Sequence, residues 1–146
     1  MSNNQFKRGE LYSVINGVAS TAVARRLQKN FRNAGLEITI EQWSILYHLW
    51  KEDGLSQQEL CTRTFRDKAS ITRLIDNIEK LGLVERTASK DDRRVNLVYL
   101  TDAAKPLQEA TYNIANQTMN EALQGISKEE IEVVKSVFQR VYENSK

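Results

Sequence analysis

Apolar residues recur at intervals of three and four along most of this chain, which is the period of an amphipathic helix. The first such run extends from Leu11 to Phe31, and Gly35, a residue type that favours helix C-termini, follows it closely. The pattern predicts one long helix over residues 11–31. The apolar positions that define it are Leu11, Val14, Ile15, Val18, Ala22, Val23, Leu27 and Phe31.

Capping boxes, in which Ser or Thr precedes Glu or Gln by three residues, mark three further helix starts. The pairs are Thr39 with Gln42, Ser56 with Glu59, and Ser127 with Glu130. They predict a helix up to about Lys51, a short helix SQQELCTR, and a last helix with Ile131, Val134, Phe138 and Val141 on its apolar side. A further helix is predicted from Thr101 to about Gly125.

Between the short helix and Thr101 the pattern predicts a helix and then a hairpin. Asp67 is placed to cap a helix KASITRLIDNIEKLG. The predicted buried side of this helix holds Ile71, Leu74, Ile75, Ile78 and Leu81. After Gly82, the segments LVERTAS and VNLVYLT are typical of short strands, and the charged KDDRR between them predicts a hairpin tip.

The order of these elements predicts the fold class. A helix-turn-helix followed by a two-stranded wing stands in the middle, and the helices that flank it must bury their apolar faces on something. Pairing with a second copy of the chain is the simplest solution. We therefore predict a mainly α fold with a small β-hairpin wing. Its parts are an N-terminal dimerisation helix (residues 1–38), a winged helix-turn-helix (39–101) and C-terminal dimerisation helices (102–146).

Charge adds a direction to this picture. The 146 residues carry a net charge of only +2, but nine basic and six acidic residues lie between Cys61 and Arg94. That stretch therefore carries +3, and the rest of the chain sums to −1. A basic middle suggests an anionic partner such as a phosphate backbone, and charge alone leaves a solvated helix face as the alternative.

Several classes of protein are not expected. The chain has no apolar run long enough for a membrane helix, and its start, MSNNQFKRGE, does not look like a signal peptide, so a cytoplasmic protein is expected. With Cys61 and His48 the only residues of their kinds, a zinc site lacks ligands. We expect no catalytic residues, metal or cofactor. Cys61 is expected to fill space, while an intermolecular disulfide or a redox role stays open.

The segment LSQQELCTRTFRDKASITRLIDNIEKLGLVERTASKDDRRVNLVYLT resembles the DNA-binding core of the MarR family of transcription regulators. Its most specific pieces are ITRLID, then LGLVER, then an acid-x-arginine wing and a strand ending in LT. Two departures follow it, namely Ala104 in place of a frequent glycine, and Pro106. The turn TFRDK is more polar than is usual, and Phe65 is expected to supply its apolar contact.

The resemblance implies a homodimer that binds double-stranded DNA at an inverted-repeat operator, with half-sites about one helical turn apart. The family regulates transcription, most often by repression that a small-molecule effector relieves. A winged helix used only for protein contact is the alternative. It would lack arginines on the recognition helix and the wing, and this chain has both.

A recognition helix places its N-terminal turns in the major groove. The predicted DNA-contacting residues here are Arg66, Lys68, Ser70, Thr72, Arg73 and Asn77. Arginine pairs with guanine and asparagine with adenine, so Arg73 and Asn77 are expected to read bases. Thr72 is expected to touch a thymine methyl or a phosphate, and the two cations before Ser70 to hold phosphates. The alternative is that Arg73 pairs with Asp76 within the helix.

The hairpin tip supplies a second predicted contact through Arg93 and Arg94. The resemblance implies that Asp92 forms a salt bridge with Arg94 and aims it at the minor groove, which attracts arginine where it is narrow. A solvated charged turn is the alternative for this segment.

Relatives bind effectors in the crevice between the dimer arm and the DNA-binding lobe. The residues expected to line that crevice here are Tyr12, Val18, Trp43, Tyr47 and Trp50. A small aromatic or apolar compound is the expected effector. The last three residues follow helical spacing, so core packing stays open as an alternative.

Overall fold

The computed structural model describes residues 8–146. Its elements are α1 (Arg8–Asn16), α2 (Val18–Asn33), α3 (Ile40–Lys51), β1 (Leu55–Ser56), α4 (Gln57–Thr64), α5 (Lys68–Lys80), β2 (Val84–Ala88), β3 (Asn96–Leu100), the 3₁₀ turn η1 (Asp102–Ala104), α6 (Lys105–Ala122) and α7 (Lys128–Ser145). The predicted fold class, a mainly helical chain with a small wing, is confirmed.

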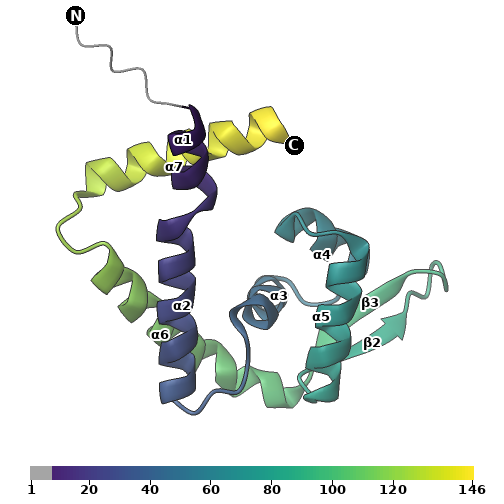
Figure 1. The fold of residues 1–146 in the computed structure, drawn as a ribbon. Coiled ribbons are helices and arrows are strands. Elements are labelled where there is room, and N and C mark those ends of the chain that lie inside the picture. The colour runs from purple at the N-terminus through teal and green to yellow at the C-terminus, as the bar shows by residue number, and fades with distance from the viewer. Residues whose placement is uncertain (1–7) are drawn as a thin grey trace, which may run out of the picture.

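The elements form a lobe and an arm (Figure 1). The lobe holds α3, α4, α5 and the sheet, whose hairpin projects away from the rest of the molecule. In the arm, α2 packs against α6, while α1 and α7 lie at the end opposite the loop that joins α2 to α3. In residues 8–146 no helix is both long enough and apolar enough to cross a membrane.

The helix starts follow the predicted caps. Thr39, Ser56 and Ser127 each complete a capping box, with both reciprocal hydrogen bonds formed. Asp67 caps α5 through its side chain, which accepts a hydrogen bond of 2.7 Å from the backbone N–H of Ser70. Each such cap stabilises its helix by about 1 kcal/mol, because it satisfies an N–H group that has no partner within the helix.

The predicted first helix is in fact two helices, separated at Gly17. A Cβ atom on Gly17 would lie 2.0 Å from the carbonyl oxygen of Ser13, so the chain can take this path only with glycine. The three- and four-residue spacing of apolar positions continues through the break, and spacing alone therefore could not reveal it.

The buried side of α5 anchors it in the lobe. Ile71, Ile75 and Ile78 are 0% exposed and belong to the main core cluster. That cluster also contains Ile45, Leu46, Leu49, Leu60 and Val98. Leu81 was predicted to share this side but is 46% exposed at the C-cap of α5, one residue past Lys80.

The sheet has one strand more than the hairpin. Strand order is β1-β3-β2, with antiparallel pairs that run from Val84–Leu100 to Ala88–Asn96 in the hairpin. The two-residue strand β1 pairs Leu55 with Val98 and was not predicted, since two residues are too few to show a period. The strand β2 is therefore one edge of the sheet.

Pro106 and the polar turn TFRDK, which both differ from the usual family pattern, have structural outcomes. Pro106 lies in the first turn of α6, where its missing N–H costs nothing. Phe65 was expected to pack within the helix-turn-helix but is 69% exposed. It ends α4 with a left-handed backbone (φ 52°), and its ring lies 5.7 Å from that of Tyr142 in α7.

The core assignment of α5 can be tested by truncation. Ile75→Ala is expected to lower the free energy of unfolding by about 2–5 kcal/mol, because it leaves a cavity in the lobe. Leu81→Ala, at an exposed position of the same segment, is expected to change it by less than about 0.5 kcal/mol. Denaturant unfolding followed by circular dichroism measures both, and equal losses would contradict the assignment.

Candidate nucleic-acid interface

The outer side of α5 is polar and open to solvent. Arg73 and Asn77 are exposed one turn apart, and Lys68 is exposed at the first position of the helix. Ser70 is half-buried, and its backbone N–H is capped by Asp67. Arg66 is exposed in the turn that precedes α5. The structure thus brings together, on one helix and the turn before it, the cations and amide that the sequence predicted for DNA contact.

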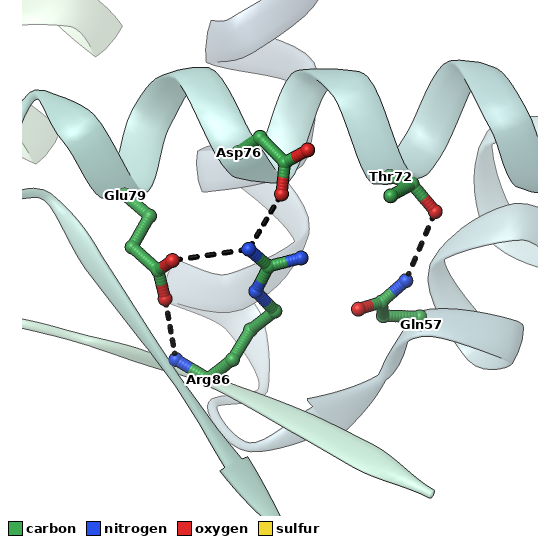
Figure 2. Close-up of polar contacts among 5 residues, drawn as sticks. All are labelled: Gln57, Thr72, Asp76, Glu79 and Arg86. Carbon is green, nitrogen blue, oxygen red and sulfur yellow. Dashed lines mark hydrogen bonds and ion pairs between the residues drawn. The ribbon is translucent and has the colours of Figure 1, made fainter.

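Thr72 differs from its neighbours. It is half-buried, and its hydroxyl accepts a hydrogen bond of 3.3 Å from the side-chain amide of Gln57 in α4 (Figure 2). This bond ties the two helices of the helix-turn-helix together. Thr72 therefore lies beside the exposed stripe, facing α4, where its hydroxyl already has a protein partner.

Arg73 forms no ion pair in the part of the chain that the structure describes. The alternative to DNA contact, an intrahelical pair with Asp76, is not observed. Asp76 instead contacts Arg86 of β2, with 2.5 Å between a carboxylate oxygen and a guanidinium nitrogen. The guanidinium of Arg73 is therefore free to meet a partner outside the chain.

Arg86 is a residue that sequence reasoning missed. Its guanidinium also contacts Glu79 at 3.0 Å, so it joins two carboxylates of α5 to the wing (Figure 2). Hydrogen bonds from Arg86 lower the pKa of the Glu79 carboxyl, and the bond to Glu79 raises the pKa of Arg86. The signal was present in the sequence, as an arginine within LGLVER after two acids three residues apart.

The wing tip holds the expected ion pair. The Nε of Arg94 lies 3.2 Å from a carboxylate oxygen of Asp92, which also accepts the backbone N–H of Arg94 at 3.0 Å. These bonds lower the pKa of Asp92. The side chain of Arg94 is nevertheless 91% exposed, and Arg93 beside it is exposed as well. The tip therefore presents an oriented guanidinium to solvent.

A shallow pocket joins the helix to the wing. Lys68 of α5 and Arg94 of the wing both line it, and its volume is about 200 Å³. Its other lining residues are Gln57, Gln58, Cys61, Val95 and Asn96. Cys61 itself is 9% exposed and belongs to the core cluster, as expected of a residue that fills space. The two cationic elements thus border one continuous surface.

The candidate effector residues fall into two groups. Trp43, Tyr47 and Trp50 of α3 meet Phe31 of α2 and Tyr112 of α6, with ring centroids 5.7–5.9 Å apart. The indole N–H groups of both tryptophans are buried, and neither has a hydrogen-bond partner among residues 8–146. The other two candidates, Tyr12 and Val18, are 67% and 82% exposed on the arm, and the aromatic contacts of residues 8–146 do not join Tyr12 to this cluster.

His48 and possible metal ligands are further candidates for functional groups. Burial, followed by the charges of Arg63 and Lys51, lowers the pKa of His48, so its imidazole is neutral at pH 7. Within the described range, residues 8–146, the structure forms no cluster of three His, Cys, Asp or Glu residues that could hold a metal ion.

Known proteins resemble this chain in sequence and in overall fold. The model of the MarR family matches residues 35–95, which span α3 to the wing tip. A MarR protein from Peptoclostridium difficile has a TM-score of 0.83 at 22% identity over 99% of this chain and 92% of its own. A MarR-family transcriptional regulator from Rhodococcus sp. RHA1 has a TM-score of 0.81 at 19% identity, over 94% of this chain and 96% of its own. A structure of reduced AbfR bound to DNA has a TM-score of 0.74 at 21% identity, over 95% of this chain and 94% of its own.

The Asp92–Arg94 pair can be tested by titration. The carboxyl of Asp92 is expected to titrate below its ordinary value of 3.8, because Arg94 favours the ionised form. A lowered folded pKa means that the pair is complete at neutral pH and is lost only as the pH falls through that pKa. Arg94→Ala is expected to bring the pKa back toward 3.8, as followed by carbon-13 NMR of the carboxyl.

The control for this titration is Asp102, whose pKa is lowered by Lys105 and should be unchanged in the same variant. An Asp92 pKa that Arg94→Ala does not move would contradict the pairing.

Proposed function

We propose that the protein is a transcription regulator that binds specific sequences of double-stranded DNA, because residues 35–95 match the model of the MarR family. The observation that carries the proposal is that two exposed guanidinium groups stand on neighbouring elements. Arg73 on α5 has no ion-pair partner within residues 8–146, and Arg94 is held outward at the wing tip, which borders the same pocket as the start of α5. Family members regulate transcription, so the match supports a regulatory rather than an enzymatic role.

In the proposed complex, α5 lies in the major groove and the wing reaches the minor groove. Ser70, Arg73 and Asn77 face base edges, while Lys68 and Arg66 hold phosphates and set the register. Thr72 contributes to the site at its edge and keeps α4 against α5. The Asp92 carboxylate orients Arg94, since the ion pair limits the conformations of an otherwise exposed side chain. A partner of this kind implies a cytoplasmic location.

A homodimer is the assembly that we propose. In α7, no residue is buried, and Val133, Val134, Val137 and Phe138 are 40–62% exposed. On α1, Leu11, Val14 and Ile15 are 40–64% exposed. Apolar faces of this size cost free energy in water, and a two-fold pairing of the arm helices buries them. The three-part division at residues 38 and 101 follows from this assignment of the arm.

Two-fold symmetry implies an inverted-repeat operator with half-sites about 10 base pairs apart, read by two copies of α5. A dimer seated on such a site excludes other proteins from it. We therefore propose repression by occlusion as the mode of action.

An aromatic or apolar effector is proposed to bind at the ring cluster of α3. What supports this is the pair of buried indole N–H groups, on Trp43 and Trp50, that have no acceptor in the described part of the chain. A buried donor without a partner costs about 1–3 kcal/mol, so a ligand with a carboxylate or carbonyl is favoured there. The cluster joins α3 of the lobe to α6 of the arm, and a ligand would act through different affinities for two dimer shapes.

The DNA assignment is tested by selecting duplexes from a random pool and measuring affinities by gel shift at several salt concentrations. Arg94→Ala is expected to weaken binding to the selected and a shuffled duplex alike, with a smaller salt slope. Arg73→Ala is expected to cost about 1–3 kcal/mol of preference for the selected duplex.

The matched control for these variants is Arg63→Ala, which removes an arginine of α4 that is paired with Glu52 at the C-terminal end of α3. Variants at positions 73 and 94 that bind like wild type would overturn the assignment of the two elements.

The dimer is tested on α7. Phe138→Asp is expected to produce a monomer and to lower affinity for the selected duplex at least about tenfold, because one half-site contact is lost. Ser136→Asp, on the opposite side of the same helix, is the control and should remain dimeric. Light scattering after size exclusion measures both masses; a wild-type monomer that still selects duplexes would contradict the proposal.

The effector site is tested by fluorescence, since Trp43 and Trp50 are the two tryptophans of the chain. Titration with benzoate and phenylacetate is expected to change the emission saturably, and the same concentrations should release the selected duplex. Trp43→Phe and Trp50→Phe each keep an aromatic ring, remove one indole N–H and leave the other tryptophan as reporter. Each should raise the concentrations of benzoate and phenylacetate that release the selected duplex. Release of DNA without a change in emission would place the effector elsewhere.

A further inference from the structure

Arg86 holds two acidic side chains of the recognition helix. Asp76 and Glu79 lie three residues apart on α5, and both reach the guanidinium of Arg86 on β2, at 2.5 and 3.0 Å (Figure 2). The arginine side chain is only 24% exposed, whereas the two carboxylates are 43% and 38% exposed. The side chain of Arg86 is therefore less exposed to solvent than the two acids, and it links α5 to strand β2 of the wing.

Glu79 adds a main-chain contact to this arrangement. Its second carboxylate oxygen accepts the backbone N–H of Arg86 at 3.1 Å. Because β2 is an edge strand, that N–H faces away from β3 and would otherwise have no partner in the sheet. One carboxylate thus binds both the backbone and the side chain of the same wing residue, which fixes the strand against the helix.

The pairing matters for Arg73, which precedes Asp76 by three residues. Side chains three apart on a helix are neighbours, and opposite charges at that spacing attract. An Asp76 without Arg86 would therefore compete with DNA for the guanidinium of Arg73, with Lys80 as the other cation within a turn. It would also place an unpaired negative charge beside the phosphates.

We propose that Arg86 is a positioning residue for base recognition, which keeps Arg73 available to DNA by holding Asp76 on the wing side of α5. The inference rests on the proposed DNA-binding function and names a residue that acts within it without touching a base. A direct contact between Arg86 and a phosphate is the competing explanation for any loss on its replacement.

The two explanations differ in what a second substitution does. The probes are a duplex selected by the wild-type protein from a random pool and a shuffled duplex of the same composition. Arg86→Gln is expected to lower the ratio of the two affinities about tenfold, the size of one arginine–guanine contact. Adding Asp76→Asn to that variant removes the competitor, and the ratio is expected to return to within about threefold of wild type.

Asp76→Asn alone should leave the ratio unchanged, because Arg86 keeps Glu79 and Arg73 stays free. Arg63→Gln is the matched control, an arginine of α4 whose ion-pair partner is Glu52 at the C-terminal end of α3. If Arg86→Gln does not fold, as judged by circular dichroism, then Arg86→Lys takes its place, with a smaller loss that Asp76→Asn again recovers.

Each outcome decides the matter. A loss in Arg86→Gln that Asp76→Asn restores supports the positioning role, since neither a direct phosphate contact nor general destabilisation would be restored by it. An unchanged ratio, or a loss that Asp76→Asn does not restore, overturns the proposal. A wild-type protein that selects no duplex refutes the proposed function itself, which is a different result.

Discussion

The structure depends on how α5 is held. One side of this helix is buried through three isoleucines, Ile71, Ile75 and Ile78, and another is tied to the wing through Arg86. Thr72 holds it to α4 on a third side. What remains free is the stripe with Arg73 and Asn77. The apolar core sets where the helix sits, and the polar ties set which side of it meets solvent.

The same logic orders the wing. The wing is a hairpin only five residues long in each strand, and β2 has one free edge. An isolated hairpin of this size is marginal in water, so its position depends on neighbours. Glu79 accepts a backbone N–H at the free edge of β2, and β1 pairs with β3 on the other side of the sheet. Asp92 orients the guanidinium of Arg94 at the tip. The side chain of Arg94 is exposed but held by its ion pair, so it loses less conformational entropy when it contacts DNA.

Local patterns predicted most of the fold, because caps and periods are local. The capping boxes, the helix α5 and the hairpin all lie where the sequence placed them. The break at Gly17 and the short strand β1 were missed, since each depends on backbone path rather than on the spacing of apolar residues. The exposure of Leu81 was missed because spacing does not show how far the core covers the end of a helix. Arg86 was missed for a related reason, because its partners lie on another element.

For the site, the sequence identified side chains but not their orientation. The resemblance to the MarR family predicted the pair of Asp92 with Arg94, but the sequence left open whether Arg73 pairs with Asp76 and gave no partner for Arg86. The structure separates them: Asp92 pairs with Arg94, Asp76 with Arg86, and Arg73 has no ion-pair partner within residues 8–146.

The central claim is that α5 and the wing contact opposite grooves of one duplex. Methylation interference tests it most directly, because dimethyl sulfate modifies guanine N7 in the major groove and adenine N3 in the minor groove. The account predicts N7 interference within each half-site, N3 interference on its flank, and loss of only the N3 signal in Arg94→Ala. Interference confined to one groove, or without two-fold symmetry, would contradict it.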